Sequence, residues 1–213
     1  TPDVSSAASD VYKRQLVNAA RVVAATGGST NAALHLPAIA NEAGLKFTLR
    51  DVVEIYNSTP YIGDMQPGGK YVAKDLYDVG GVPVVIKSLL DGGYINGDCI
   101  TVTGKTIAEN HKEVIFPTNQ DVVYKCDNPI SENSSVVGLW GNLAPDGCIS
   151  KIAGLKNLTF KGKAKCFDSE EDALTAVLKN EIKAGDAVII RYEGPKGGPG
   201  MREMLSTTGA TVS

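Results

Sequence analysis

The sequence is poor in the residues on which metal centres and nucleophilic sites are commonly built. Its 213 residues include only two histidines, His35 and His111, which argues against a His-based catalytic triad or zinc site. The four cysteines are spaced by 27, 22 and 18 residues, with no C-x-x-C pair and no ferredoxin-like group. They are Cys99, Cys126, Cys148 and Cys166. We expect each of them to be a small buried hydrophobic residue that ligates neither iron nor zinc.

The sequence also has no excess of positive charge and no long apolar segment. Its formal net charge is −3, its pI is about 5.4, and it contains no run of like charges. A nucleic-acid or membrane-surface protein needs a basic face, so neither partner is expected. No stretch of 18 apolar residues and no signal peptide is found. These features predict a cytoplasmic protein.

Residues 1–15, TPDVSSAASDVYKRQ, differ in character from the rest of the chain. The segment is rich in serine and alanine and resembles the translation of a sequencing adapter or an assembly artefact. The alternative is a genuine short N-terminal extension. It has no apolar face large enough to offset the entropy of ordering. We therefore expect residues 1–15 to be a non-native extension that is irregular or loosely helical and packs on nothing.

Residues 16–118 have a helical pattern. The first predicted helix begins at Leu16 and ends at Gly27-Gly28. The second is capped by residues 29–31, with Leu34, Leu36, Ile39 and Ala40 facing inward. Further helices are expected at residues 49–55, 71–77, 83–90 and 106–111, and Thr48 is the predicted cap of the first of these. A strand is expected at residues 99–102.

Residues 119–213 have a different texture, with short β-type segments separated by turns. Strands are predicted at residues 122–124, 136–139, 149–152, 164–167 and 187–191. One helix interrupts them, with Asp168 as its cap, Glu171 completing a capping box, and a buried face of Ala173, Leu174, Val177 and Leu178. We place the boundary between the two parts at residues 118/119.

Three glycine-containing segments could carry chemistry. In residues 26–31, TGGSTN, free N–H groups at a helix start could bind a carboxylate, although the segment could equally be a plain connection between two helices. The segment ending in Gly104-Lys105-Thr106 is not a phosphate loop, because Cys99 stands where the motif needs glycine. In residues 191–203, Glu203 lies where a helix is expected to begin and could cap it or ligate Mg²⁺.

Five segments of this sequence together resemble the dihydroxy-acid and sugar-acid dehydratase family. The resemblance covers about residues 16–209, in order and without large gaps. Met-Arg-Glu-Met at 201–204 is similar to the dihydroxy-acid branch, since sugar-acid dehydratases tend to have proline at the position of Arg202. The segments are TGGSTNAALHLPAIANEAG, GDCITVTGKTIAEN, GNLAPDGCISKIAG, FDSEEDAL and GDAVIIRYEGPKGGPGMREML.

The resemblance implies a specific reaction. Such enzymes dehydrate 2,3-dihydroxy-3-methylbutanoate and its methylpentanoate homologue to 2-oxo acids for valine and isoleucine synthesis. An iron–sulfur cluster acts on the departing 3-hydroxyl, Mg²⁺ binds the carboxylate end, and a serine takes the C2 proton. Glu203 matches the downstream Mg²⁺ ligand, and Gly28, Ser29, Thr30, Gly198 and Gly200 are the expected substrate-binding residues.

The resemblance also implies what to expect outside this sequence. The cluster cysteines and the other Mg²⁺ ligands lie upstream of the GGSTN segment, and the serine lies beyond Ser213, so we expect no catalytic residue in this chain and no activity from it alone. The implied fold is α/β: the C-terminal part of an α/β/α domain, then a partial swivelling β/β/α domain. The intact protein is expected to be a homodimer acting on a small dihydroxy acid. A sugar-acid dehydratase fragment and a non-catalytic anion-binding module remain the alternatives.

Overall fold

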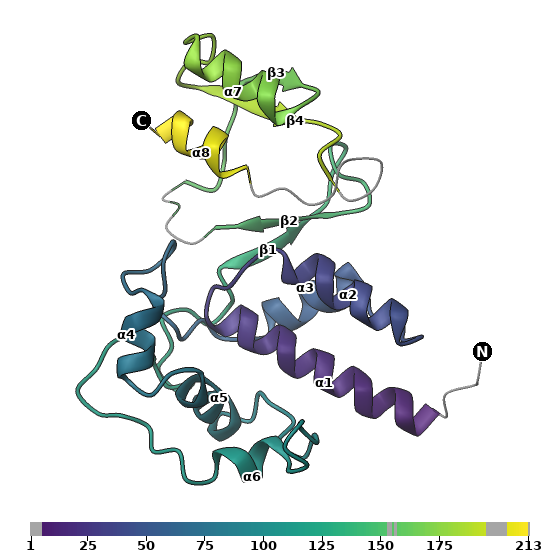
Figure 1. Ribbon diagram of the computed structural model, residues 1–213, viewed down its shortest axis with the longest axis vertical. Coiled ribbons are helices and arrows are strands. Elements are labelled where there is room, and N and C mark those ends of the chain that lie inside the picture. Colours follow the sequence, from purple (N-terminus) through teal and green to yellow (C-terminus); the bar gives the residue numbers. More distant parts are fainter. Residues whose placement is uncertain (1–5, 153–154, 156, 195–203, 213) are drawn as a thin grey trace. The chain divides into compact units, whose positions relative to one another are not determined.

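The computed structural model describes residues 6–152, 155, 157–194 and 204–212. The chain divides into two compact units, Thr1–Lys156 and Asn157–Ser213. Both contain helices and strands (Figure 1). The expected α/β content is therefore confirmed, and each unit is considered by itself below.

The first unit consists of helices joined to a short antiparallel hairpin (Figure 1). In the hairpin, Val136 pairs with Lys151 and Leu139 pairs with Cys148. The helices are α1 (Ser6–Ala25), α2 (Ala32–Glu42), α3 (Leu49–Asn57), α4 (Ala73–Asp78), α5 (Val82–Asp91) and α6 (Ile107–His111), and the strands are β1 (Val136–Leu139) and β2 (Cys148–Lys151).

Two apolar clusters hold the first unit together. In the first, Ala20 and Ala24 of α1 pack with α2, α3 and β1, where the small alanine side chains allow close approach of the backbones. In the second, Ala25 at the end of α1 packs with α5 and with residues 122–123. The end of α1 therefore lies between the two clusters, which fixes where the following glycine segment begins.

Thr48 caps α3 as predicted, and Thr106 caps α6 with the same chemistry. Thr48 Oγ1 accepts a hydrogen bond from the Asp51 N–H, and the Asp51 carboxylate accepts one from the Thr48 N–H at 2.8 Å. Thr106 and Glu109 form the same reciprocal pair at α6. Such pairs satisfy N–H groups that a helix start leaves without partners, so the predicted starts of α3 and α6 are confirmed.

The second unit contains a β-α-β arrangement in which β3 (Lys163–Phe167) pairs in parallel with β4 (Asp186–Ile190). Helix α7 (Glu170–Leu178) connects the two strands and packs on both of them and on α8 (Leu205–Val212). A parallel pair needs a crossover connection of this kind. The strands at 164–167 and 187–191 are thus confirmed to within one residue.

The interior face of α2 differs from the expected one. Leu34 and Ile39 are 37% and 57% exposed, whereas Ala33 and Ala40 are buried. Ala33 and Ala40 lie two turns apart on one side of the helix, and Leu34 and Ile39 are rotated about 100° to either side of it. The expectation that Leu34 and Ile39 face inward is therefore wrong, because the close contact uses the small residues.

Two predicted strands are absent from the described part of the chain. Residues 99–102 and 122–124 form only isolated bridges, Ile100 with Thr106 and Gly63 with Val123. The Thr101 N–H donates to Lys105 O at 2.9 Å, which folds the first segment back on itself in a turn. A β-type sequence becomes a strand only when a partner strand runs alongside it.

The cap of α7 is also displaced by one residue from the prediction. Ser169, not Asp168, accepts the hydrogen bond from the Asp172 N–H, while Asp168 pairs with Arg191. The buried face of the helix also differs from the expected one, because Ala176 is buried and Leu178 is exposed. The expected capping box of Asp168 with Glu171 is therefore wrong, although the helix itself is confirmed.

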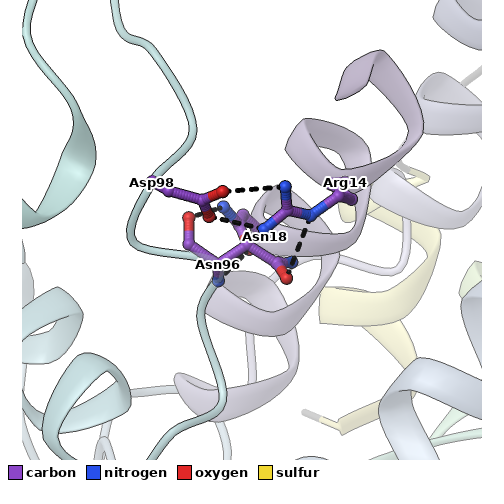
Figure 2. A network of polar contacts seen from close by, with 4 residues as sticks. All are labelled: Arg14, Asn18, Asn96 and Asp98. Carbon is purple, nitrogen blue, oxygen red and sulfur yellow. Dashed lines mark hydrogen bonds and ion pairs between the residues drawn. The ribbon is translucent and has the colours of Figure 1, made fainter. Parts of the chain in front are cut away.

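Residues 6–15 form the first half of α1, and part of this segment makes contacts. Arg14 hydrogen-bonds to Asp98 and Asn96 in a network that also includes Asn18 (Figure 2). Lys13 pairs with Asp51 at 3.1 Å, and Gln15 donates to Ile100 O. The expectation that residues 1–15 pack on nothing is wrong for residues 13–15, because helix propagation from residue 16 carries them past polar partners. Their non-native origin stays a prediction.

Candidate ligand cavity beside the first glycine segment

The first unit contains a cavity of about 470 Å³ beside the end of α1. This volume lies in the range of small-molecule pockets, roughly 300–1,000 Å³. The cavity brings together parts of the chain that are far apart in sequence. Its lining residues are Val22, Thr26, Gly27, Gly28, Ser29, Met65, Gln66, Pro67, Leu76, Val82, Val85 and Lys151.

Gly27 has a conformation and surroundings that a larger residue does not fit. Its φ is +57°, in the left-handed region. A Cβ atom at this position would lie 2.9 Å from Cε2 of the buried Tyr61 ring and 3.0 Å from Ser135 Oγ. The turn at Gly27 therefore depends on glycine, and it delivers Gly28 and Ser29 to the cavity wall.

The start of α2 presents the backbone donors that the sequence predicts. Ser29 Oγ accepts from the Asn31 N–H at 3.1 Å, and Asn31 is the N-cap residue. Within the described ranges, the N–H groups of Ser29 and Thr30 have no acceptor. Gly28 and Ser29 line the cavity, whereas Thr30 is not among its lining residues. The position of residues 27–31 at a helix N-terminus is thus confirmed.

Lys151 is a cavity residue that the sequence reasoning did not identify. It ends β2 and is half-buried, and burial lowers the pKa of its ammonium group from the ordinary 10.5. No carboxylate among the described residues forms an ion pair with it. The sequence did contain one indication that Lys151 faces the interior. Side chains alternate along a strand, so Lys151 lies on the same face of β2 as Ile149, which packs against the core.

Ser135 adds a second polar group near the glycine turn. It is 8% exposed, and its hydroxyl has no hydrogen-bond partner among the described residues. Its backbone oxygen accepts from the Ile152 N–H at 2.8 Å, which places it next to the β1–β2 hairpin. Buried hydroxyls are nearly always hydrogen-bonded, so we expect the Ser135 hydroxyl to bond to a group that is not among the described residues.

Three of the predicted site residues, Gly198, Gly200 and Glu203, lie outside the described residues. Glu193, the next carboxylate upstream, has a different role. It is buried, and its Oε1 accepts a hydrogen bond from the Glu170 N–H at 2.9 Å, at the first residue of α7. A carboxylate there complements the positive end of the helix, so Glu193 serves the fold of the second unit.

The cysteines are scattered and differ in burial. Cys99 is buried and Cys126 half-buried, whereas Cys148 and Cys166 are exposed, each on a two-stranded sheet. The expectation that all four are buried is therefore wrong for these two. Burial raises the pKa of the Cys126 thiol, which donates to Ser88 O. No group of three His, Cys, Asp or Glu side chains within the described ranges could hold a metal ion.

Comparison with known families decides what this arrangement belongs to. Residues 4–110 match the family described as dihydroxy-acid/6-phosphogluconate dehydratase N-terminal, and residues 121–213 match its C-terminal counterpart. The chain belongs to the dihydroxy-acid/6-phosphogluconate dehydratase family. The boundary predicted at 118/119 falls in the interval between the two matched regions.

Two similar proteins are named as dihydroxy-acid dehydratases. The chain is 62% identical over 200 residues to dihydroxy-acid dehydratase 2 of Bradyrhizobium diazoefficiens, covering 94% of this chain and 35% of that protein. It is 65% identical to dihydroxy-acid dehydratase of Pelagibacter ubique, with the same coverage. The chain thus spans about a third of the length of the curated relatives that it matches. In the described part of the chain, no helix is both long and apolar enough for a membrane span.

Proposed function

We propose that this chain is an internal part of a dihydroxy-acid dehydratase. The intact enzyme removes water from 2,3-dihydroxy-3-methylbutanoate and its methylpentanoate homologue, giving 2-oxo acids for valine and isoleucine synthesis. The observation that carries this proposal is the 62–65% identity, over 94% of the chain, to relatives named for this activity. The Met-Arg-Glu-Met segment at 201–204 favours this branch over the sugar-acid dehydratases.

The proposal extends to the architecture of the intact protein. Residues 16–118 are the C-terminal part of an α/β/α domain, and residues 119–213 are a partial swivelling β/β/α domain. The two family matches on either side of residues 111–120 support this division. The intact protein is a cytoplasmic homodimer with a small dihydroxy acid as its substrate.

The cavity beside Gly27 has the features of a substrate-binding region. The substrate carries a carboxylate at one end and a branched alkyl group at the other. The free N–H group of Ser29 suits the carboxylate, because it lines the cavity at the start of α2 and a helix start attracts anions. The apolar side chains of Val22, Leu76 and Val85 suit the alkyl group. These contacts bind and orient the acid, and its chemical conversion needs further groups.

The cofactors of the reaction do not find their ligands among the described residues. When bound, the iron–sulfur cluster supplies a Lewis acid for the departing hydroxyl and Mg²⁺ supplies a counter-charge for the carboxylate. The described residues contain no group of three side chains that fits either. Glu203, which lies outside them, is the residue that we propose as a Mg²⁺ ligand. It is one carboxylate, whereas Mg²⁺ sites use one or two with substrate oxygens.

A chimera tests the proposed role of this chain. Residues 16–213 replace the aligned segment of the Bradyrhizobium diazoefficiens relative, and the product is introduced into a valine and isoleucine auxotroph that lacks the dehydratase. We expect growth to be restored by the chimera and by its Glu181→Gln variant, since Glu181 is an exposed residue. Glu203→Gln should abolish growth, because a neutral amide replaces a charged metal ligand.

Two outcomes contradict this proposal in different ways. A folded, cluster-loaded chimera that fails to restore growth argues against the function. Normal growth with Glu203→Gln argues only against the choice of carboxylate. Glu193 is then a poor substitute, because its carboxylate is already bonded at the start of α7.

A further inference from the structure

We propose that Lys151 is the cationic anchor for the carboxylate of a short, branched hydroxy acid bound in the cavity beside Gly27. The identity of the acid rests on the proposed function, whereas the anion site rests on the cavity and its polar groups. Lys151 comes from β2, and Gly28 and Ser29 come from the connection of α1 to α2. The hairpin and the helix start thus meet at one cavity.

The charge of Lys151 is not balanced by a carboxylate in any ion pair among the described residues. Lysine side chains are mostly exposed or paired, because burial of an unpaired ammonium group costs free energy. Lys151 is half-buried and has no ion-pair partner among the described residues. Burial lowers its pKa, which reports the same cost. A bound carboxylate would supply the missing negative charge and offset that cost.

A further donor in the cavity wall favours an anion over a neutral ligand. Ser29 lines the cavity, and its N–H is free within the described ranges at the positive end of the eleven-residue helix α2. The hydroxyl of Ser135, which is more than nine-tenths buried and has no partner among the described residues, lies against Gly27, although Ser135 itself is not a lining residue. The Lys151 ammonium group and the Ser29 N–H match the two oxygens over which a carboxylate spreads its negative charge.

Apart from Thr26 and Gln66, most of the remaining cavity wall is apolar, and this indicates the rest of the ligand. Val22, Met65, Leu76 and Val85 are apolar and come from α1, the segment before α4, α4 itself and α5. They suit a compact alkyl group better than a chain of hydroxyl groups, because burying hydroxyls without partners is costly. A monocarboxylate with a branched alkyl end therefore fits this cavity better than a sugar acid or inorganic phosphate.

Ligand-observed NMR titrations of the 213-residue chain test this inference. The probes are 2,3-dihydroxy-3-methylbutanoate, gluconate and inorganic phosphate, each titrated into the wild type, Lys151→Gln, Lys151→Arg and Lys161→Gln. We expect the dihydroxy acid to bind most tightly and Lys151→Gln to weaken it by about ten- to hundredfold, the effect of losing a charged hydrogen bond. Lys151→Arg should retain part of the affinity. Lys161 is exposed and lies in the other unit, so Lys161→Gln should bind as the wild type does.

The outcomes separate the two proposals. Equal affinity of the wild type and Lys151→Gln, or no binding of any probe to the wild type, overturns the role of Lys151. Binding of gluconate or phosphate through Lys151 without binding of the dihydroxy acid keeps the anion site and counts against the dehydratase substrate. Circular dichroism of each variant establishes that it is folded, and Lys151→Arg provides a second test should Lys151→Gln not fold.

Discussion

Replacement of Gly27 by alanine should destabilise the first unit through two separable effects. The first is conformational: a φ of +57° costs a residue with a Cβ atom about 1–2 kcal/mol. The second is steric. The new Cβ would lie 2.9 Å from the Tyr61 ring and 3.0 Å from Ser135 Oγ, inside the 3.5–4.0 Å of ordinary contact between carbon atoms.

The steric part is the larger of the two. The ring of Tyr61 is 6% exposed and lies in a packed interior, so it has little room to move aside. Overpacking of this kind costs about 1–3 kcal/mol. Gly27→Ala should therefore lower the free energy of unfolding by about 2–5 kcal/mol. Gly44 is the matched control, because its φ is +70° and a Cβ atom there meets nothing within 4 Å. Gly44→Ala should cost only the conformational part.

Urea unfolding followed by tryptophan fluorescence measures both changes. The chain has one tryptophan, Trp140, and it lies in the first unit, so the signal reports on that unit. With a slope of about 2 kcal/mol per molar urea, the two variants should differ in midpoint by about 0.5–1.5 M. Equal midpoints for Gly27→Ala and Gly44→Ala would refute the close packing of Tyr61 and Ser135 around the glycine turn.

Three other substitutions have expected results from the same assay. Asn18→Ala should cost about 1–3 kcal/mol, since its side chain is buried and makes three hydrogen bonds with Asn96. Arg14→Ala should change the midpoint little, because its ion pair with Asp98 is exposed. The reverse order would show that the Arg14–Asp98 pair, and not Asn18, stabilises this contact. Burial raises the pKa of Asp51, but the hydrogen bonds from Thr48 outweigh it and hold the pKa below the ordinary 3.8. The stability that the ionised Asp51 carboxylate contributes is therefore present above pH 3.8 and is lost as the pH falls through the lowered pKa. The stability difference between the wild type and Asp51→Asn should therefore shrink on going from pH 7 to pH 3, and a constant difference would argue against the capping box.

Local chemistry explains why some elements could be predicted from the sequence. Thr48 and Thr106 each precede an acidic residue by three positions, and a capping pair of this kind needs nothing beyond its own helix start. The glycine turn at residues 27–28 is similar, because a left-handed residue after a helix favours glycine wherever the helix lies. These features could therefore be predicted from each segment of the sequence by itself.

The features that could not be predicted depend on distant partners. Residues 122–124 have strand-forming composition, yet they form only an isolated bridge with residues 62–64, with one backbone hydrogen bond from Asp64 N–H to Val122 O and one from Tyr124 N–H to Ile62 O. The exposure of Ile39 follows from the use of small alanines at the contact between helices, which the apolar pattern does not distinguish. Lys151 becomes a site residue only when β2 lies beside a turn more than 120 positions earlier in the sequence. Its role depends on tertiary structure that no local pattern contains.

The most direct test of the central claim is the substrate choice of the purified chimera that carries residues 16–213. Formation of the 2-oxo acid is measured with 2,3-dihydroxy-3-methylbutanoate and with gluconate under the same conditions, after the cluster and Mg²⁺ have been reconstituted. A dihydroxy-acid dehydratase should give kcat/KM values at least about a hundredfold higher for the branched acid, since unpaired hydroxyls in an apolar wall cost several kcal/mol. Equal or faster turnover of gluconate would contradict the account and assign the chain to a sugar-acid dehydratase.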